Sequence, residues 1–185
     1  YIADGIFKSQ DEIDNHAVQD GAGIGRIRWR DINNDGFITE ADQDWIYDPT
    51  PDFCYGFNIY LQYKNVDFTM FWQGVQGVDI ISDLKKETDI WAGLNIGFLN
   101  KGKRLLDAWS PANPGSNIPA LSVSDNNNEK RVSTYWVENG SYLKLRTIQL
   151  GYNVPSSFAA KLFMERLRCY VSAQNLLTIK SSSFT

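Results

Sequence analysis

The sequence predicts an all-β fold, and within that class an antiparallel transmembrane β-barrel portion with long hairpins, long extracellular loops and few short helices. Three observations carry this prediction. Apolar and polar side chains alternate along several segments, those segments are long, and the connections between them are alternately long and short. Alternation with a period of two is typical of a strand with one apolar and one polar face.

The clearest segment is a β-hairpin at residues 53–74. Every second residue from Phe53 to Tyr63 is apolar or aromatic, the alternation resumes at Val66, and Lys64-Asn65 between the two runs can form a tight turn. Each arm is close to the ~9–11 residues that a tilted strand needs to cross a bilayer, whereas strands of soluble proteins usually have ~5–6 residues. Taken alone, this hairpin fits a soluble β-sandwich equally well.

Two further strands are expected. Residues 141–153 alternate with a change of phase near Arg146-Thr147, which predicts a β-bulge, and residues 167–174 alternate without a break. Helical spacing predicts short helical segments at residues 10–13, 79–88, 101–109 and 155–163.

The connections between the expected strands favour the barrel. They run long at residues 2–52, short at 64–65, long at 75–140 and short at 154–166. The strands of a membrane barrel must alternate in this way, because short turns lie on the periplasmic side and long loops on the outer side. A soluble sandwich has no such requirement.

Composition excludes some classes of protein. The net charge is -4, which argues against a nucleic-acid partner. The chain has no run of about 18 apolar residues that would predict a transmembrane helix, and its first residues do not resemble a signal peptide. Two cysteines, Cys54 and Cys169, are too few for a disulfide scaffold. The alternation places them on opposite faces of the sheet, and both are expected to be free thiols.

Residues 31–42 contain the sharpest local motif, which is typical of a calcium-binding loop. Oxygen-bearing side chains stand at loop positions one, three and five, glycine at six, an apolar residue at eight and a carboxylate at twelve, as a loop that wraps a hard cation needs. Calcium is therefore the candidate cofactor. Its candidate ligands are Asp31, Asn33, Asp35, Phe37 through its carbonyl oxygen, and Asp42.

The loop departs from the usual pattern at position twelve, where Asp42 replaces a longer glutamate. This predicts weaker affinity, or a loop that is closed by hydrogen bonds alone. The alternative to a calcium site is an Asx-rich turn that holds its shape without metal. A paired EF-hand is not expected, because residues 26–30 before the loop alternate as a strand instead of forming a helix.

The long connection at residues 75–140 contains Trp91 and Trp109. Connections of this length without regular structure are uncommon in compact domains and are usually functional. Exposed tryptophans can stack on sugar rings or anchor a protein partner, so both residues are candidates for ligand or partner contact. The alternative is that they pack the connection onto itself.

The sequence contains little that indicates an enzyme. The acidic pair Asp11/Glu12 is a conceivable glycosidase dyad, but such chemistry needs carboxylates held about 5–9 Å apart across a cleft, which spacing along a loop does not establish. The common serine-nucleophile and zinc-protease motifs do not occur in the sequence. We therefore expect no catalytic activity.

Seven short motifs follow one another over nearly the whole chain. They are Gly5-Ile-Phe-Lys-Ser-Gln-Asp-Glu-Ile13, Asp31-Ile-Asn-Asn-Asp-Gly-Phe-Ile38, Pro51-Asp-Phe-Cys-Tyr-Gly-Phe57, Phe71-Trp-Gln-Gly-Val75, Asn139-Gly-Ser-Tyr-Leu-Lys-Leu-Arg146, Leu150-Gly-Tyr-Asn-Val-Pro155 and Tyr170-Val-Ser-Ala-Gln-Asn-Leu-Leu177. As a set, these segments resemble the SusC/RagA family of TonB-dependent outer-membrane transporters.

The resemblance implies a barrel of about 22 strands with an N-terminal plug, capped by a SusD-like surface lipoprotein. Such a protein imports oligosaccharides or peptides across the bacterial outer membrane with energy from TonB. Residues 1–185 would be a late part of the barrel in contact with outer-membrane lipid, without the plug through which TonB acts and without the final strands. The calcium-like loop and residues 75–140 would lie on the extracellular side, near the lipoprotein or the substrate.

A soluble protein of another class remains the alternative. It would be a calcium-stabilised β-sandwich that binds carbohydrate through Trp91 or Trp109. Such a module would fold without detergent and lose stability when a chelator removes calcium, whereas a barrel segment requires a membrane or detergent to fold.

Overall fold

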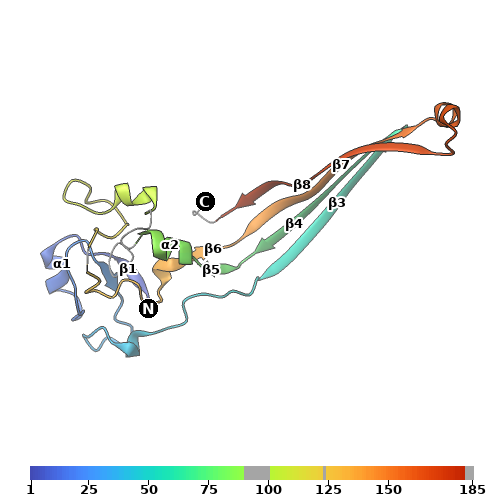
Figure 1. The fold of residues 1–185 in the computed structure, drawn as a ribbon. Coiled ribbons are helices and arrows are strands. Elements are labelled where there is room, and N and C mark those ends of the chain that lie inside the picture. Colours follow the sequence, from blue (N-terminus) through green and yellow to red (C-terminus); the bar gives the residue numbers. More distant parts are fainter. Residues whose placement is uncertain (90–100, 123, 182–185) are drawn as a thin grey trace. The chain divides into compact units, whose positions relative to one another are not determined.

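The computed structural model describes residues 1–89, 101–122 and 124–181. Its regular structure consists mainly of antiparallel strands with a few short helices, as predicted (Figure 1). The chain divides into two compact units. Unit 1 is built from residues within 1–47 and 81–138, and unit 2 from residues within 48–80 and 139–183.

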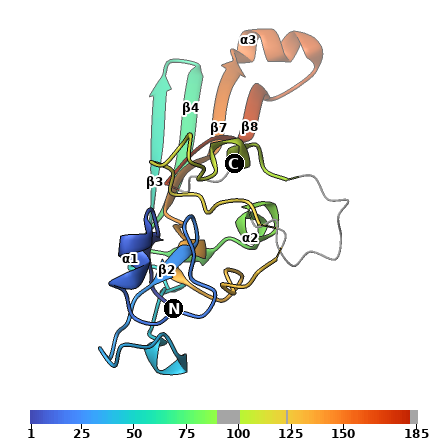
Figure 2. The same cartoon turned by 90° about the vertical axis from the view of Figure 1, so that its left-hand side faces the viewer.

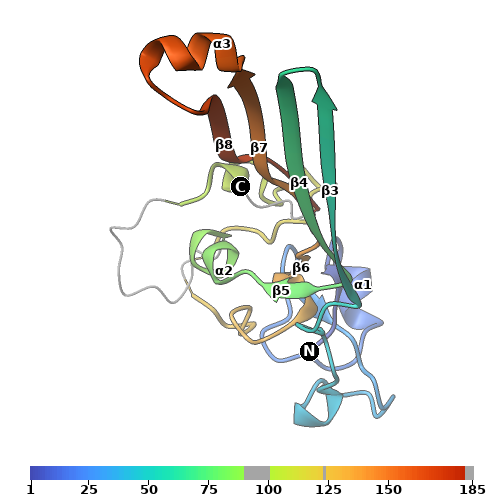
Figure 3. The same ribbon diagram turned by 90° about the vertical axis from the view of Figure 1, so that its right-hand side faces the viewer.

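Unit 2 contains one antiparallel sheet of four strands in the order β3-β4-β7-β8. The predicted hairpin is confirmed, because Tyr63 pairs with Val66 across the turn at residues 64–65. All four strands are long enough to cross a bilayer, and Figure 3 shows them side by side. Their bounds are β3 Phe53–Tyr63, β4 Val66–Gln76, β7 Tyr142–Val154 and β8 Leu167–Lys180.

The two short connections of this sheet lie at the same end, which we call the short-turn end (residues 64–65 and 155–166; Figure 2). The N–H of Asn153 donates to the carbonyl of Asn65 at 2.7 Å, which ties one connection to the other. The predicted short helix is confirmed as α3, Ser156–Ala159, which continues as the 3-10 turn η4, Ala160–Leu162. It begins directly after Pro155, whose fixed φ suits the start of a helix.

The bulge predicted in the third strand is confirmed at Arg146. Phe71 of β4 pairs with Thr147 and Trp72 pairs with Leu145, so Arg146 is the extra residue. Strand β8 is longer than the predicted 167–174, because it continues to Lys180 through an irregularity that lies opposite the same bulge.

Unit 1 has little regular structure. Strand β1, Ala3–Ile6, pairs with β2, Ile27–Trp29, and the predicted first helix is confirmed as α1, Gln10–Asp14. The buried apolar side chains include Phe7, Ile27, Trp29 and Trp136. The remaining elements of unit 1 are η1 Glu40–Asp42, α2 Asp83–Asp89, η2 Lys103–Asp107 and η3 Thr134–Trp136. A two-stranded sheet of β5, Asp79–Ile81, and β6, Val137–Asn139, contains residues of both units.

Two predicted helical segments need correction. The helix expected at residues 79–88 begins only at Asp83, because Ser82 caps it through an Oγ that accepts the N–H of Lys85 at 3.3 Å, while residues 79–81 form β5. The segment 101–109 contains only the 3-10 turn η2. Within the described residues, no helix is long and apolar enough to cross a membrane.

Candidate functional site

The four-stranded sheet separates its side chains into two faces. Met70 of β4 pairs with Ile59 of β3 and Ile148 of β7, whereas the preceding residue, Thr69, pairs with Gln149. Pleating turns successive residues of a strand to opposite sides, and directly paired residues share a side. Met70 and its partners therefore belong to one face, and Thr69 and Gln149 to the other.

The apolar face carries Phe53, Tyr55, Phe57, Ile59, Leu61 and Tyr63 of β3, Val66, Phe68, Met70 and Trp72 of β4, Leu143, Leu145, Ile148, Leu150, Tyr152 and Val154 of β7, and Leu167, Cys169, Val171, Ala173, Leu177 and Ile179 of β8. The polar face carries Cys54, Asn58, Tyr60 and Gln62 of β3, Asp67, Thr69 and Gln73 of β4, Lys144, Thr147, Gln149 and Asn153 of β7, and Arg168, Tyr170, Ser172 and Gln174 of β8, together with Phe71 and Val75.

The bulge maintains this separation along the whole of β7. If residues 143–148 formed a regular strand, Leu143 and Leu145 would fall on the face opposite to Ile148, because residues three or five positions apart point to opposite sides; the unpaired Arg146 brings them to the same face. The same register confirms that Cys54 and Cys169 lie on opposite faces, and both are free thiols.

An ion pair spans the polar face near the short-turn end. Arg168 of β8 donates to Asp67 of β4, from Nε to Oδ1 at 3.2 Å and from Nη2 to Oδ2 at 2.5 Å. Gly151 of β7 lies between them, and a Cβ at that position would be 2.6 Å from the guanidinium nitrogen and from each carboxylate oxygen. The glycine therefore allows the pair to cross the strand between its two partners. Sequence reasoning missed this pair because the two residues are far apart in the chain.

The candidate calcium loop is shaped by hydrogen bonds from its own backbone. The two carboxylate oxygens of Asp31 accept the N–H groups of Asn34 at 2.8 Å and Gly36 at 2.9 Å. An oxygen of Asp35 accepts the N–H of Phe37 at 2.8 Å. Gly36 has a φ of 84°, as the sequence predicted for a glycine that forms the tight turn.

The two remaining candidate ligands with oxygen-bearing side chains lie in different surroundings. Asn33 is exposed, and its amide oxygen accepts the N–H of Asp35 at 3.0 Å. Asp42 is fully buried, and its carboxylate accepts the N–H groups of Ile32 at 2.8 Å and Thr39 at 2.7 Å. It therefore closes the loop from the inside through bonds to the backbone.

The chemistry of this donor set suits a hard cation, because it offers only oxygen. Its arrangement, however, is that of a loop closed by its own hydrogen bonds. In the part of the chain that the structure describes, no group of three or more His, Cys, Asp or Glu side chains is placed to hold a metal ion. Asp31, Asn33 and Asp35 keep lone pairs at the surface of the loop, while Asp42 is occupied by backbone donors.

The pKa of Asp42 is lowered. Burial acts to raise the pKa, but hydrogen bonds from backbone N–H groups, those of Thr39 and Ile32 among them, stabilise the ionised form and outweigh burial. Because the folded pKa lies below the ordinary value of 3.8, the stability contributed by Asp42 is fully present above that pH and is lost as the pH falls through the folded pKa.

We therefore expect acid to open this loop. In the whole protein, pepsin cleavage within residues 31–42 should increase as the pH is lowered below the ordinary carboxylate range, which mass spectrometry of the fragments would measure. An Asp42→Asn variant, which cannot titrate, should be cleaved more readily at the higher pH and should respond little to further acid. An identical pH dependence in both proteins would contradict this role for Asp42.

Of the two candidate contact tryptophans, Trp91 lies outside the described residues. Trp109 is half-buried in unit 1, where its indole packs on Gly25 so closely that a Cβ at Gly25 would be 2.7 Å from the ring. Its backbone N–H donates to the carbonyl of Ile118 at 2.8 Å. Trp109 therefore takes part in packing, but its ring lies against the connection before β3, whereas its backbone bond stays within residues 75–140.

Sequence reasoning also missed a buried polar network in unit 1. Gln19 donates to Asn127 Oδ1 at 2.6 Å and accepts the N–H of Trp29 at 2.9 Å. Glu129 accepts the N–H of Ile27 at 3.0 Å. Gln19, Asn127 and Glu129 are all buried, so the network joins strand β2 to a segment about a hundred residues away.

Glu129 also forms an ion pair with Arg26, whose Nη1 lies 3.1 Å from Oε2. A second nitrogen of Arg26 donates to the carbonyl of Ala120. Burial raises the pKa of Glu129, and the charge of Arg26 together with hydrogen bonds from Ile27 and Asn127 lowers it only in part. The network therefore loses stability as the pH rises from the ordinary glutamate value of 4.5 through the raised pKa.

Comparison with known proteins yields relatives among receptors, while no family model matches the chain. TonB-dependent receptor P3 of Formosa agariphila is 40% identical over 148 residues, which is 80% of this chain and 14% of the relative. TonB-dependent receptor P26 of the same organism is 34% identical over 173 residues, 94% of this chain and 17% of the relative. The chain thus spans less than a fifth of the length of these relatives.

Two solved structures are similar to the model. The RagAB peptide transporter aligns with a TM-score of 0.62 and 30% identity over 72% of this chain and 14% of that chain. The RagAB peptide importer in the open-open state aligns with a TM-score of 0.71 and 25% identity over 97% of this chain and 18% of that chain.

An antiparallel sheet of long strands, with one apolar and one polar face and with alternately short and long connections, defines a portion of a transmembrane β-barrel. The relatives show to which family of barrel proteins the chain belongs. The chain belongs to the TonB-dependent receptors of the SusC/RagA family and is part of a protein of the bacterial outer membrane. The family membership confirms the resemblance of the short motifs and replaces the soluble β-sandwich alternative.

Proposed function

We propose that this chain is a segment of an outer-membrane importer in a SusC/SusD-like complex, which takes up oligosaccharides or peptides with energy supplied through TonB. The observation that carries the proposal is the separation of the sheet into an apolar and a polar face. In this role the apolar face contacts outer-membrane lipid, and the polar face lines the interior through which the solute passes.

The long connections then lie on the extracellular side, because they join the strand ends opposite to the short-turn end. The buried network of Gln19, Asn127 and Glu129 supports a common function for them, since it ties the connection before β3 to the connection between β4 and β7. We assign to this part of the chain the contact with a SusD-like surface lipoprotein and with substrate. TonB acts through the plug of the family, and we assign no residue of this chain to that contact.

The names and descriptions of the similar proteins support transport and not catalysis. The proteins that match this chain are named as receptors, and the similar structures are described as a peptide transporter and a peptide importer. Peptides are therefore the first substrate class to test, with oligosaccharides second. No residue of the chain is assigned a catalytic role.

The proposal predicts the compartment and the partner of the whole protein. An affinity tag on the receptor that contains this sequence should recover it from the outer-membrane fraction together with a surface lipoprotein in comparable amount, as measured by mass spectrometry. Peptides or oligosaccharides that co-purify would indicate the substrate class. Recovery of a protein of about this length from the soluble fraction, without a lipoprotein, would contradict the proposal.

We further propose that the loop at residues 31–42 binds calcium weakly. The supporting observation is that Asn33 and Asp35 are exposed, Asp31 is half-buried beside them, and all three accept backbone N–H groups of the same turn. A bound calcium ion would add a cross-link between these oxygens and stabilise the extracellular loop. The carbonyl of Phe37 completes the proposed donor set, while Asp42, whose carboxylate accepts the N–H groups of Ile32 and Thr39, closes the loop behind it.

Titration of the whole receptor with calcium should give a dissociation constant in the range of about 10⁻⁴–10⁻³ M that is typical of extracellular calcium modules. Isothermal titration calorimetry would measure it. Alanine at both Asp31 and Asp35 should abolish this binding, whereas Glu40→Ala, which removes a neighbouring exposed carboxylate, should not. Unchanged uptake and lipoprotein binding in the double variant would count against a functional role for the loop.

A further inference from the structure

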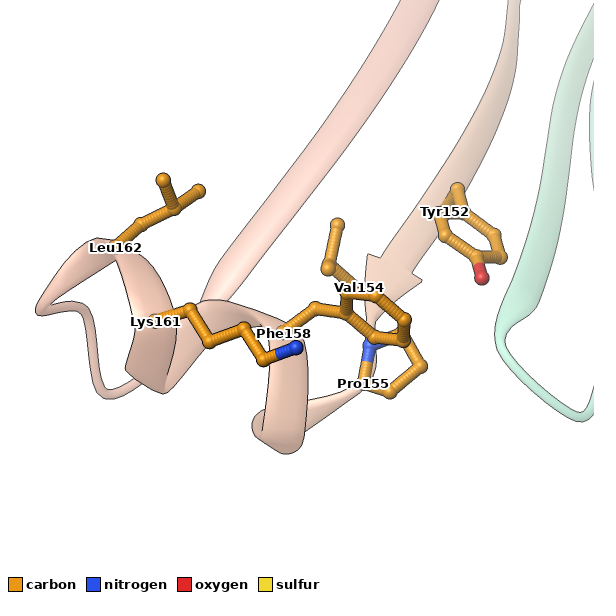
Figure 4. A pocket seen from close by; sticks show the side chains of 6 residues that line it. All are labelled: Tyr152, Val154, Pro155, Phe158, Lys161 and Leu162. Atoms are coloured by element: carbon orange, nitrogen blue, oxygen red, sulfur yellow. The ribbon is translucent and has the colours of Figure 1, made fainter.

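An apolar hollow of about 540 Å³ lies at the short-turn end of the sheet, between the end of β7 and the helical segment α3–η4 (Figure 4). Its volume falls within the ~300–1,000 Å³ that is usual for ligand pockets. It is lined by Tyr152, Val154, Pro155, Phe158, Lys161 and Leu162. Lysine is the only charged residue in this set.

The hollow belongs to the side of the sheet that faces lipid. Tyr152 pairs with Cys169 and Val154 pairs with Leu167, and both pairs belong to the apolar face. Short turns of a membrane barrel lie on the periplasmic side. The hollow is therefore placed at the level where the acyl chains of the periplasmic leaflet meet their headgroups.

The helical segment beside the hollow exposes apolar side chains. Phe158 is 60% exposed, Leu162 is 57% exposed and Phe163 is fully exposed. Short segments with an apolar side and basic residues characteristically lie in the membrane interface. Tyr63 and Tyr152 at the same end of the apolar face add the aromatic residues that are enriched at that depth.

The short-turn end also carries an excess of positive charge. Lys64, Lys161 and Arg166 are all exposed, and Glu165 is the acidic residue among the two short connections. The ammonium of Lys161 lies 5.3 Å from the centre of the Phe158 ring, which places it at the hollow's apolar wall. A lysine beside an apolar wall suits a ligand that has an anionic group next to an apolar chain.

We propose that this hollow binds an anionic phospholipid of the periplasmic leaflet. One acyl chain lies against Val154, Phe158 and Leu162, and the phosphate accepts from the ammonium of Lys161. The inference rests on the proposed function, because it requires the barrel to be embedded with the short-turn end on the periplasmic side. It adds to that function a lipid site that anchors the connection between β7 and β8.

The test uses the whole receptor, purified in detergent, stripped of lipid and titrated with phosphatidylglycerol or with phosphatidylcholine of the same acyl chains. Native mass spectrometry would count the bound lipids. Wild-type receptor should prefer phosphatidylglycerol, and Lys161→Gln should weaken its binding by about fivefold, the effect of one basic residue near an anionic surface. Phe158→Ala should weaken the binding of both lipids, because it removes part of the apolar wall.

The matched control is Lys103→Gln, which removes an exposed lysine on the short helical turn η2 of unit 1 and should leave phosphatidylglycerol binding unchanged. Equal binding of the two lipids by wild type, or equal phosphatidylglycerol binding by wild type and Lys161→Gln, would overturn this inference alone, provided that the receptor still shows the heat-modifiable gel migration of a folded barrel. A wild-type receptor that is soluble without detergent and lacks this migration would overturn the inference together with the proposed function.

Discussion

Replacing Met70 by arginine is expected to destabilise the membrane-embedded receptor by about 2–4 kcal/mol, the usual cost of a basic residue on the lipid side near the middle of a barrel strand. Met70 lies close to the centre of β4 and pairs with Ile59 and Ile148 on the apolar face. In the proposed barrel its side chain meets only hydrocarbon, which offers no partner for a guanidinium. Denaturant unfolding of the whole receptor in phosphatidylcholine vesicles, followed by tryptophan fluorescence, would measure the loss.

The neighbouring residue provides the matched control. Thr69→Arg introduces the same side chain one position earlier on the same strand, but on the polar face, where Thr69 pairs with Tyr60 and Gln149. It should cost much less, because the arginine remains hydrated. The amount of heat-modifiable receptor in the outer membrane gives a second readout. Equal losses for the two variants, or a larger loss for Thr69→Arg, would show that the faces are assigned wrongly.

Replacing Glu129 by alanine is expected to open the buried network of unit 1 at a cost of about 3–5 kcal/mol, since it removes one partner of a buried ion pair. The side chain of Arg26 is only 14% exposed and would lose its carboxylate. The N–H of Ile27 would lose its acceptor as well. Hydrogen exchange of the whole receptor should then show protection at Ile27 falling by about a hundredfold or more.

An exposed carboxylate serves as the control for Glu129. Asp4 lies 3.6 Å from Arg28 and 3.4 Å from Arg30, and its side chain is 44% exposed. Asp4→Ala should cost no more than about 1 kcal/mol, because solvent screens surface ion pairs. Glu129→Gln should retain much of the protection, since its amide oxygen can still accept from Ile27. Similar exchange in the Glu129→Ala and Asp4→Ala variants would contradict a structural role for the network.

In the proposed transporter, the two parts of the chain have different tasks. The sheet must place an apolar face against lipid, and its stability depends on keeping every apolar residue in register with that face. The long connections form their own compact unit, which depends on a small apolar core and on buried hydrogen bonds. A change in one unit should therefore leave the hydrogen-exchange protection of the other largely intact.

Local features of the chain were predictable from the sequence. The hairpin at residues 53–74, the bulge near Arg146 and the placement of Cys54 and Cys169 on opposite faces all follow from period-two alternation, which depends only on the order of neighbouring residues. Gly36 takes the positive φ that its position in the loop requires. The order of the short motifs identified the family for the same reason, because it too can be read from the sequence without knowledge of the fold.

Only the tertiary structure decided the features that join distant segments. The contact of Gln19 with Asn127 spans 108 residues and that of Asp67 with Arg168 spans 101, and neither leaves a periodic signal in the sequence. The burial of Asp42 depends on how the chain closes around it, so the loop's motif alone did not separate a metal ligand from an acceptor of backbone hydrogen bonds. The reason is physical: alternation reports which side of a strand a residue faces, whereas burial and pairing depend on which other segments fold against it.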